Sequence, residues 1–138
     1  MPCTATLATS VSGPTGALQA GGAESCLLAA KTARDLWRRK HPRLLAEQKV
    51  PRLVAPATVH AAFHKASELF DLQLDLVPCA ADGTLRAKDM VKHLDKDVAL
   101  VVVSAPSYPT GVLDPVEEVA KAAEVRGVSC HVDACFGA

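Results

Sequence analysis

The sequence of 138 residues predicts an α/β fold, a mostly parallel sheet flanked by helices. Residues 98–103 form a continuous apolar run, which is typical of a strand buried in the middle of a parallel sheet. Short apolar runs alternate along the chain with segments of helical spacing, which favours parallel strands joined by right-handed crossovers. Hydrophobic residues make up 49% of the chain and aromatic residues only 4%, a composition suited to helices that pack on a buried sheet.

The first predicted helix follows a short N-terminal stretch. Residues 1–15 are small and polar, and we expect them to be disordered or frayed, with the domain itself over residues 16–138. A glycine pair then leads into a helix over residues 26–40. Its apolar face is expected to carry Leu27, Leu28, Ala30, Leu36 and Trp37. Residues 42–50 indicate a charged surface connection.

The remaining elements follow from the same patterns, since alternating or continuous apolar runs predict strands and helical spacing predicts helices. They are a strand at 52–55, a helix at 57–70, a strand at 72–78, a turn at 82–83, a helix at 85–94, the strand at 98–103 and a strand at 128–135. A stretch rich in Pro and Gly, 104–111, predicts an irregular loop. Asp114 is expected to N-cap the next helix, with Pro115 at its first position and its end at Gly127.

Composition excludes several classes of function. Lys plus Arg equals Asp plus Glu at 15 each, so no basic field is available for a nucleic acid. Five cysteines, an odd number without a CxxC pair, indicate reduced thiols in a cytosol-facing protein. No run approaches the roughly 18 apolar residues that span a bilayer. The first thirty residues contain no Lys or Arg, which argues against a signal or transit peptide, so we expect a cytoplasmic protein without a membrane segment.

One carboxylate stands out near the C-terminus. Asp133 lies at the end of a short apolar strand, and ligands of parallel α/β sheets bind just beyond the carboxyl ends of the strands. A buried carboxylate is costly without a partner, so Asp133 can be interpreted as the partner of a cationic ligand atom. It can equally be a carboxylate that caps the following turn.

The glycine pair before the first helix is a second candidate. Glycines allow a ligand to approach the backbone closely, and the first turn of a helix attracts anions. A phosphate at residues 22–25 is therefore physically plausible. The same pattern also occurs in ordinary loops, so it is weak by itself.

Taken together, these segments form an ordered series: Gly21-Gly22-Ala23-Glu24-Ser25, His60-Ala61-Ala62-Phe63, Ser104-Ala105-Pro106, Gly111-Val112-Leu113-Asp114-Pro115 and His131-Val132-Asp133-Ala134-Cys135. In kind, order and separation the series resembles the pyridoxal-phosphate-dependent group II decarboxylases, and within them the sphingosine-1-phosphate lyase branch. The resemblance covers residues 16–138. It implies that the chain is part of the large domain of a fold-type-I pyridoxal-phosphate enzyme.

The resemblance assigns binding of pyridoxal 5'-phosphate to Gly22, Ala23, His60, Ser104, Asp133 and Ala134. Asp133 would pair with the protonated pyridine nitrogen, and His60 would stack on the ring. Amides around Gly22 and Ala23 would hold the cofactor phosphate. Ala134 would pack where a larger side chain would clash with the ring.

The reaction implied is cleavage of a phosphorylated sphingoid base to a fatty aldehyde and phosphoethanolamine. The resemblance also implies a homodimer, and full-length eukaryotic relatives on the endoplasmic reticulum membrane that face the cytosol. Another pyridoxal-phosphate-dependent amino acid decarboxylase is the alternative activity.

The chain departs from the family's pattern in two respects. Alanine replaces the usual Thr at residue 23 and the usual Ser at residue 20, which removes a phosphate hydrogen bond of about 1.5–3 kcal/mol. The Schiff-base lysine of the family lies beyond the strand of Asp133, and all eight lysines of this chain precede that point. We therefore expect a fragment truncated before that lysine and the C-terminal domain, with no catalytic residue of its own and inactive alone.

Non-catalytic alternatives remain open, namely an inert or dimerisation fragment, or a metal site. His60 and His64 have the four-residue spacing of a zinc-binding pair, and His131 and Cys135 are also four apart. We expect Cys135 to be a small buried residue. Tyr108 lies in a loop near the strand ends from which it could approach a substrate, and we expect it to pack within that loop. The other histidines, His41, His64 and His93, are expected to be solvated.

Overall fold

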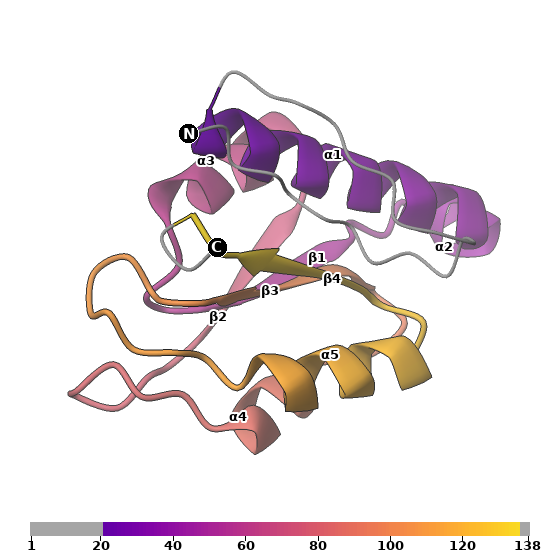
Figure 1. The fold of residues 1–138 in the computed structure, drawn as a ribbon. Helices are drawn as coiled ribbons and strands as arrows, with labels where there is room; N and C mark the ends of the chain where they lie inside the picture. Colours follow the sequence, from indigo (N-terminus) through magenta and orange to yellow (C-terminus); the bar gives the residue numbers. More distant parts are fainter. Residues whose placement is uncertain (1–20, 136–138) are drawn as a thin grey trace, which may run out of the picture.

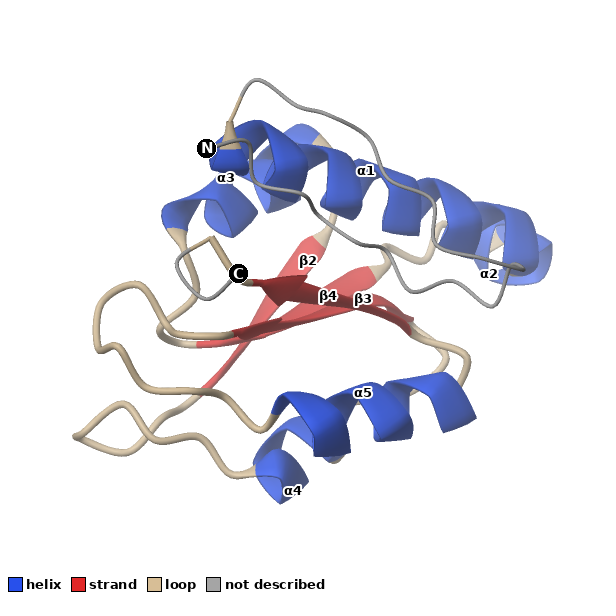
Figure 2. Cartoon of the chain, viewed as in Figure 1, coloured by secondary structure: helices blue, strands red, loops and turns tan. Residues whose placement is uncertain are grey.

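The computed structural model describes residues 21–135, and the expectations for residues 1–15 and for position 20 lie outside this range. It confirms the α/β prediction: four parallel strands in the order β2-β1-β3-β4 form one sheet between two layers of helices (Figures 1 and 2). The elements are α1 (Gly22–Lys40), α2 (Pro42–Ala46), β1 (Arg52–Pro56), α3 (Ala61–Leu69), β2 (Gln73–Val77), α4 (Ala87–Val91), β3 (Val98–Ser104), α5 (Val116–Val125) and β4 (Ser129–Asp133).

The central strand β3 is buried on both faces, as its continuous apolar run predicts. Leu100 and Val102 belong to a core beneath α1 and α3, whereas Val101 and Val103 belong to a second core beneath α4 and α5. Figure 2 shows the two helical layers on opposite sides of the red strands. Each face of the sheet therefore has its own apolar core, and the strand ends are left for polar groups.

Helix α1 packs on the sheet through small side chains and not through the leucines that the pattern suggests. It begins at Gly22, four residues before the predicted start. Its fully buried positions include Cys26, Ala30, Ala33 and Trp37, whereas Leu28 is 38% exposed. Alanines at the contact let the helix approach the strands closely, so the hydrophobic stripe is shifted from the one predicted.

Several other predicted elements are shorter or placed differently, among them the strand predicted at 128–135, which spans only Ser129–Asp133 (β4). The connection at residues 42–50 contains the helical turn α2, which buries no side chain. Helix α3 begins at Ala61 and not at residue 57, because Ala57 and Thr58 form a turn and His60 is extended before the helix starts. Helix α4 has five residues where ten were predicted. In β2 the expected alternation is wrong at its end, where Leu76 is 38% exposed and Val77 is fully buried.

The prediction that Asp114 caps α5 is wrong. Its carboxylate instead accepts a hydrogen bond of 2.7 Å from the backbone amide of Ser104, at the end of β3. The backbone amide of Asp114 in turn donates to the carbonyl of Ser104 at 3.0 Å. Pro115 occupies the N-cap position, and α5 ends at Val125, two residues before the predicted end. Burial raises the pKa of the Asp114 carboxyl above its ordinary value.

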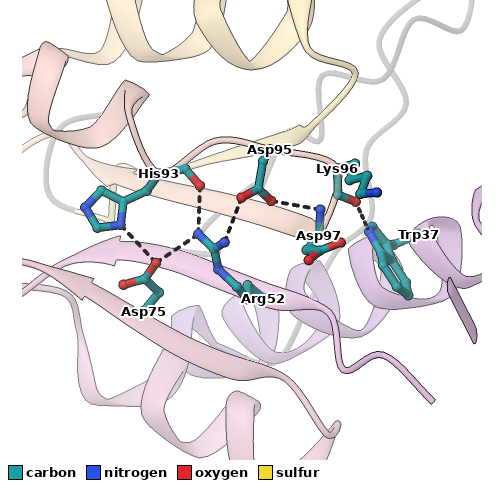
Figure 3. Close-up of polar contacts among 7 residues, drawn as sticks. All are labelled: Trp37, Arg52, Asp75, His93, Asp95, Lys96 and Asp97. Carbon is teal, nitrogen blue, oxygen red and sulfur yellow. Dashed lines mark hydrogen bonds and ion pairs between the residues drawn. The ribbon is translucent and has the colours of Figure 1, made fainter. Parts of the chain in front are cut away.

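An ion-pair network lies at the amino end of the strands, away from the end where Asp114 binds Ser104 (Figure 3). The guanidinium of Arg52 donates to the carboxylates of Asp75 and Asp95, both at 2.9 Å, and to the carbonyl of His93 at 2.7 Å. The ring of His93 contacts Asp75 at 2.9 Å, so the prediction of a solvated His93 is wrong. His41 is also not simply solvated, since its Nδ1 lies 3.0 Å from the carbonyl of Trp37.

Candidate functional site

A cavity of about 130 Å³ lies beyond the carboxyl ends of the strands, where parallel α/β sheets bind their ligands. The start of α1, the N-cap of α3, the loop after β3 and the end of β4 meet there. Its lining residues are Gly22, Ala23, Cys26, His60, Pro106, Tyr108, Asp133 and Cys135. A larger groove of about 630 Å³ beside β2 and α4 contains none of the predicted site residues.

Asp133 is the last residue of β4 and reaches the cavity half-buried. Its backbone carbonyl accepts a hydrogen bond of 2.9 Å from the amide of Ala105, which extends the β3–β4 pairing. One carboxylate oxygen accepts the amide of Cys135 at 3.4 Å. The carboxylate therefore contacts the following turn and also lines the cavity, and its pairing with a cationic ligand atom stays a prediction.

His60 is fixed by the start of α3. Its Nδ1 accepts a hydrogen bond of 3.1 Å from the backbone amide of Ala62, so the histidine acts as the N-cap of the helix. Since Nδ1 is the acceptor, the neutral ring carries its proton on Nε2. The backbone contact thereby fixes both the orientation and the tautomer of the ring that lines the cavity.

Tyr108 is a cavity residue that we did not assign to the site. Its ring meets the ring of His60 edge-on, with centroids 5.5 Å apart, and its side chain is 66% exposed. The prediction that it packs within its loop is wrong. Its place in the irregular loop after the central strand was the available signal, because such loops border the ligand crevice.

The start of α1 supplies backbone to the cavity through Gly22 and Ala23. No side chain caps this helix, and Gly21 at the N-cap is fully extended. The first turn of a helix presents amide groups without intrahelical partners, which suits an anion. A Cβ placed on Gly22 would lie 2.9 Å from Sγ of Cys135, so this position is shaped by the absence of a side chain.

The other two predicted binding residues do not line the cavity. Ser104 is buried and is the register partner of Asp133 across β3 and β4. Ala134 follows Asp133 and is half-buried. The structure therefore brings Gly22, Ala23, His60 and Asp133 together on the cavity. Ser104 and Ala134 are neighbours of Asp133, the first across the sheet and the second along the chain.

Two cysteines also line the cavity, and no pattern in the sequence predicts either one there. Cys26 is buried on α1, one helical turn after Gly22. Cys135 is exposed in the turn after β4, so the prediction of a small buried residue is wrong. Only the folded contact between these two elements places both side chains on one cavity.

The histidine in the middle of β4 lies beneath the site. His131 is 2% exposed, and its ring centroid is 5.6 Å from that of Phe63 on α3. Burial lowers the pKa of His131, and the nearby charge of Asp133 opposes this shift. The imidazole is therefore neutral and belongs to the core.

The metal alternative named two pairs, and only one member of each lines the cavity. His60 lines it whereas His64 is exposed on α3, and Cys135 lines it whereas His131 is buried. Within residues 21–135, no group of three or more His, Cys, Asp or Glu side chains is arranged to hold a metal ion. None of the helices in this range is long and apolar enough to cross a membrane.

The parallel sheet and the cavity beyond its strand ends define an α/β protein of the class that binds ligands at such a crevice. Residues 4–138 match the family described as the pyridoxal-dependent decarboxylase conserved domain. The chain belongs to this family, whose members are pyridoxal-phosphate-dependent enzymes.

Several curated relatives are sphingosine-1-phosphate lyases. The chain is 38% identical over 125 residues to the sphingosine-1-phosphate lyase of Dictyostelium discoideum, covering 88% of this chain and 22% of the relative. It is 38% identical over 122 residues to sphingosine-1-phosphate lyase 1 of Rattus norvegicus, covering 88% of this chain and 20% of that relative. The chain thus spans about a fifth of the length of these relatives. An L-tyrosine/L-aspartate decarboxylase of Methanocaldococcus jannaschii is 33% identical, with 88% and 31% covered.

Solved structures show the same architecture. The sphingosine-1-phosphate lyase of Burkholderia pseudomallei superposes with a TM-score of 0.72 at 32% identity, over 85% of this chain and 26% of that one. A glutamate decarboxylase of Lactobacillus brevis superposes with a TM-score of 0.76 at 22% identity, over 85% and 29%, and shares the fold. The predicted fold type and family are confirmed.

Proposed function

We propose that the cavity at the strand ends is the pyridoxal phosphate site of a carbon–carbon lyase. The whole protein would cleave phosphorylated sphingoid bases to a fatty aldehyde and phosphoethanolamine. The observation that carries the proposal is the convergence of Gly22, His60 and Asp133 on one cavity from three separate elements. Family membership and the lyase relatives support the same activity.

The residues at the helix end of the cavity fit a phosphate. Gly22 and Ala23 present the first turn of a 19-residue helix, and Gly22 has no side chain of its own, while Sγ of Cys135 lies beside it, 2.9 Å from its ideal Cβ position. Amides in such a turn attract an anion without needing a cationic side chain. Ala23 lacks the hydroxyl that the family usually places there, so we expect the backbone to supply most of the binding.

The residues at the strand end fit a cationic ring. The carboxylate of Asp133 would accept a hydrogen bond from the protonated ring nitrogen and so keep the proton on that nitrogen. The imidazole of His60 would pack on the ring face. When bound, pyridoxal phosphate supplies an electron sink for breaking a bond at the substrate carbon. Because Nδ1 of His60 already accepts a backbone amide, its ring cannot turn away without losing that hydrogen bond.

None of the eight lysines lines the cavity, and Lys65, the lysine that follows His60 on α3, is exposed. We therefore expect this chain to bind the cofactor reversibly, without a lysyl linkage. Ser104 and Ala134 are proposed to support the site from its border. The homodimer and the cytosolic location that the family resemblance implies stay predictions.

An amino acid decarboxylase is the second candidate, because the Methanocaldococcus jannaschii relative with that name is 33% identical over the same residues. The cavity described here would serve either reaction, since both depend on the same cofactor contacts. Assaying the whole protein with a phosphorylated sphingoid base and with amino acids would separate them: aldehyde release supports the lyase, and carbon dioxide release the decarboxylase.

The cofactor site is tested by equilibrium dialysis of the chain against pyridoxal phosphate, followed by borohydride reduction and peptide mapping. We expect saturable binding that Asp133→Asn weakens about tenfold or more, the loss of a charge-assisted contact of about 1.5–3 kcal/mol. The control is Asp71→Asn, the same change at an exposed residue whose positive φ of 52° asparagine tolerates. Equal binding by both variants, or a reduced lysyl adduct at one site, would refute the proposal.

A further inference from the structure

The turn after β2 and the loop after β3 both lie beyond the carboxyl ends of the strands (Figure 1). They meet where Gly83 of the turn faces Thr110 of the loop. A Cβ placed on Gly83 would lie 2.6 Å from Cγ2, 2.7 Å from Oγ1 and 2.8 Å from Cβ of Thr110. Neither residue lines the cavity of the candidate site. The contact therefore joins the loop that carries Tyr108 to a turn outside that cavity.

Gly83 is restricted by space as well as by conformation. Its φ of 86° lies in the region that favours glycine, and Gly111 and Gly127 also have positive φ, 69° and 67°. A Cβ on either of those two glycines would meet no described atom within 4 Å. At Gly83, in contrast, the side chain of Thr110 already occupies the place of a Cβ.

Rotation of the threonine side chain cannot make room. Turning about the Cα–Cβ bond moves Cγ2 and Oγ1 of Thr110 but leaves its Cβ in place. That Cβ would be 2.8 Å from a Cβ on Gly83, whereas ordinary contacts begin at 3.4 Å. A side chain on Gly83 therefore requires a backbone movement of about 0.6 Å, the difference between these two distances.

The turn that carries Gly83 is closed by hydrogen bonds of its own. The amide of Gly83 donates to the carbonyl of Ala80, and the amide of Ala80 donates to the carbonyl of Thr84, both at 2.9 Å. The amide of Thr84 donates to the carboxylate of Asp82 at 2.9 Å. A turn held at three points yields little, so the movement passes to the longer loop after β3.

That loop is a closed unit built on Ser107, which is 1% exposed. The amide of Ser107 donates to the carbonyl of Val112 at 2.8 Å, and its carbonyl accepts the amide of Gly111 at 2.9 Å. Its hydroxyl oxygen accepts a hydrogen bond of 3.1 Å from Oγ1 of Thr110. Tyr108 follows Ser107 directly, so a displacement of Thr110 moves Tyr108 with it.

We propose that Gly83 and Thr110 are positioning residues, whose contact sets where Tyr108 meets His60 at the cavity. The turn after β2 thereby controls the geometry of a site that it does not line. How tightly the cavity holds pyridoxal phosphate follows from that geometry, and this consequence alone rests on the proposed function. The position of the Tyr108 ring rests on the contacts between the two loops.

The position of the ring is tested by nuclear magnetic resonance of the chain labelled with ring-¹³C tyrosine. Tyr108 is the only tyrosine in the sequence, so one set of ring signals is observed. Its edge-on contact with His60, with centroids 5.5 Å apart, brings ring protons within range of nuclear Overhauser transfer. We expect this transfer in the wild-type chain and its loss in Gly83→Ala.

The matched control is Gly127→Ala, the same substitution at a positive φ of 67° with open space around it. It shares the backbone strain of Gly83→Ala but has no threonine to displace, so the ring contact should remain. Retention of the contact in Gly83→Ala, its loss in both variants, or its absence from the wild-type chain would overturn the proposal.

A rescue variant separates the contact from a general failure to fold. Thr110→Gly removes all three atoms that a Cβ on Gly83 would meet. Adding Gly83→Ala to Thr110→Gly should therefore change the ring contact no more than Gly127→Ala changes it in the wild-type chain. If Gly83→Ala alone does not fold, the double variant should fold. A double variant as impaired as Gly83→Ala would contradict the steric mechanism.

The consequence for the ligand is tested by equilibrium dialysis of the same variants against pyridoxal phosphate. We expect Gly83→Ala to weaken binding about fivefold or more, because a small displacement of a contacting group lowers affinity. Gly127→Ala should bind like the wild-type chain. Equal binding by the two variants would refute the effect on the ligand. A wild-type chain that binds no cofactor would refute the cofactor site, while the ring contact would still decide the role of Gly83 and Thr110.

Discussion

Replacing Gly22 with alanine should change the free energy of unfolding by an amount that depends on Cys135, near the other end of the chain. Alanine is better than glycine inside a helix by about 0.5–1 kcal/mol, so Gly22→Ala should stabilise α1. The new Cβ would lie 2.9 Å from Sγ of Cys135, whereas ordinary contacts begin at 3.4 Å. The sulfur must therefore retreat by about 0.5 Å, the difference between these two distances. This contact opposes the helical gain.

The two effects separate in a double-mutant cycle measured by urea unfolding. Cys135→Ala removes the sulfur, so Gly22→Ala should raise the free energy of unfolding by about 0.5–1 kcal/mol in that background. In the wild-type background the gain should be smaller by a coupling on the order of 1 kcal/mol. The same change in both backgrounds would refute the proposed contact between the helix start and the turn after β4.

Three further predictions concern groups beneath and beside the site. Asp114→Ala should lower the free energy of unfolding by about 1–3 kcal/mol, because it leaves the buried amide of Ser104 without its acceptor; a loss below that range in urea unfolding would contradict this role. The free energy of unfolding should fall as the pH drops below 6.5, the ordinary pKa of histidine, because His131 takes up a proton in the unfolded chain and resists protonation when buried. In unfolding curves measured from about pH 7 to 5, His131→Gln should make the free energy of unfolding depend less on pH. Trp37→Phe should cost about 1 kcal/mol by leaving the carbonyl of Lys96 without the 2.8 Å indole hydrogen bond, and an unchanged urea midpoint would argue against that contact.

Strong local patterns predicted the frame of the fold. The run at β3 could be placed between other strands because an apolar segment without alternation must be covered on both faces. The helical stripe of α1 was misplaced because leucines dominate a hydrophobicity pattern, whereas close packing on the sheet selected the alanines. Asp114 was assigned to a cap because it precedes Pro115, and the sequence holds no sign that the amide of Ser104 would bind its carboxylate.

Some residues of the candidate site could likewise be predicted from local patterns, and others could not. Asp133 and Gly22 could be predicted because each stands at the end of a recognisable element, one at a strand end and one at a helix start. Cys26 and Cys135 could not, because nothing local distinguishes them from other cysteines until the two elements meet. The position of Tyr108 near the strand ends could be predicted from its loop, but its ring contact with His60 across 48 positions of sequence could not, because no local pattern encodes that pairing.

The charged side chains at the two ends of the strands differ, and among the described residues the cavity end has no cationic side chain in its lining. Arg52 binds two carboxylates and a carbonyl at the amino end of the sheet, where it joins β1 to the end of α4 and to β2 (Figure 3). At the carboxyl end, no Lys or Arg lines the cavity, and Asp133 is the carboxylate that does. An anion held there must depend on the amides of the first turn of α1, and a cation on Asp133. The two ends of one cavity are thus suited to opposite charges, which is the pattern that a ligand with a phosphate at one end and a protonated ring nitrogen at the other requires.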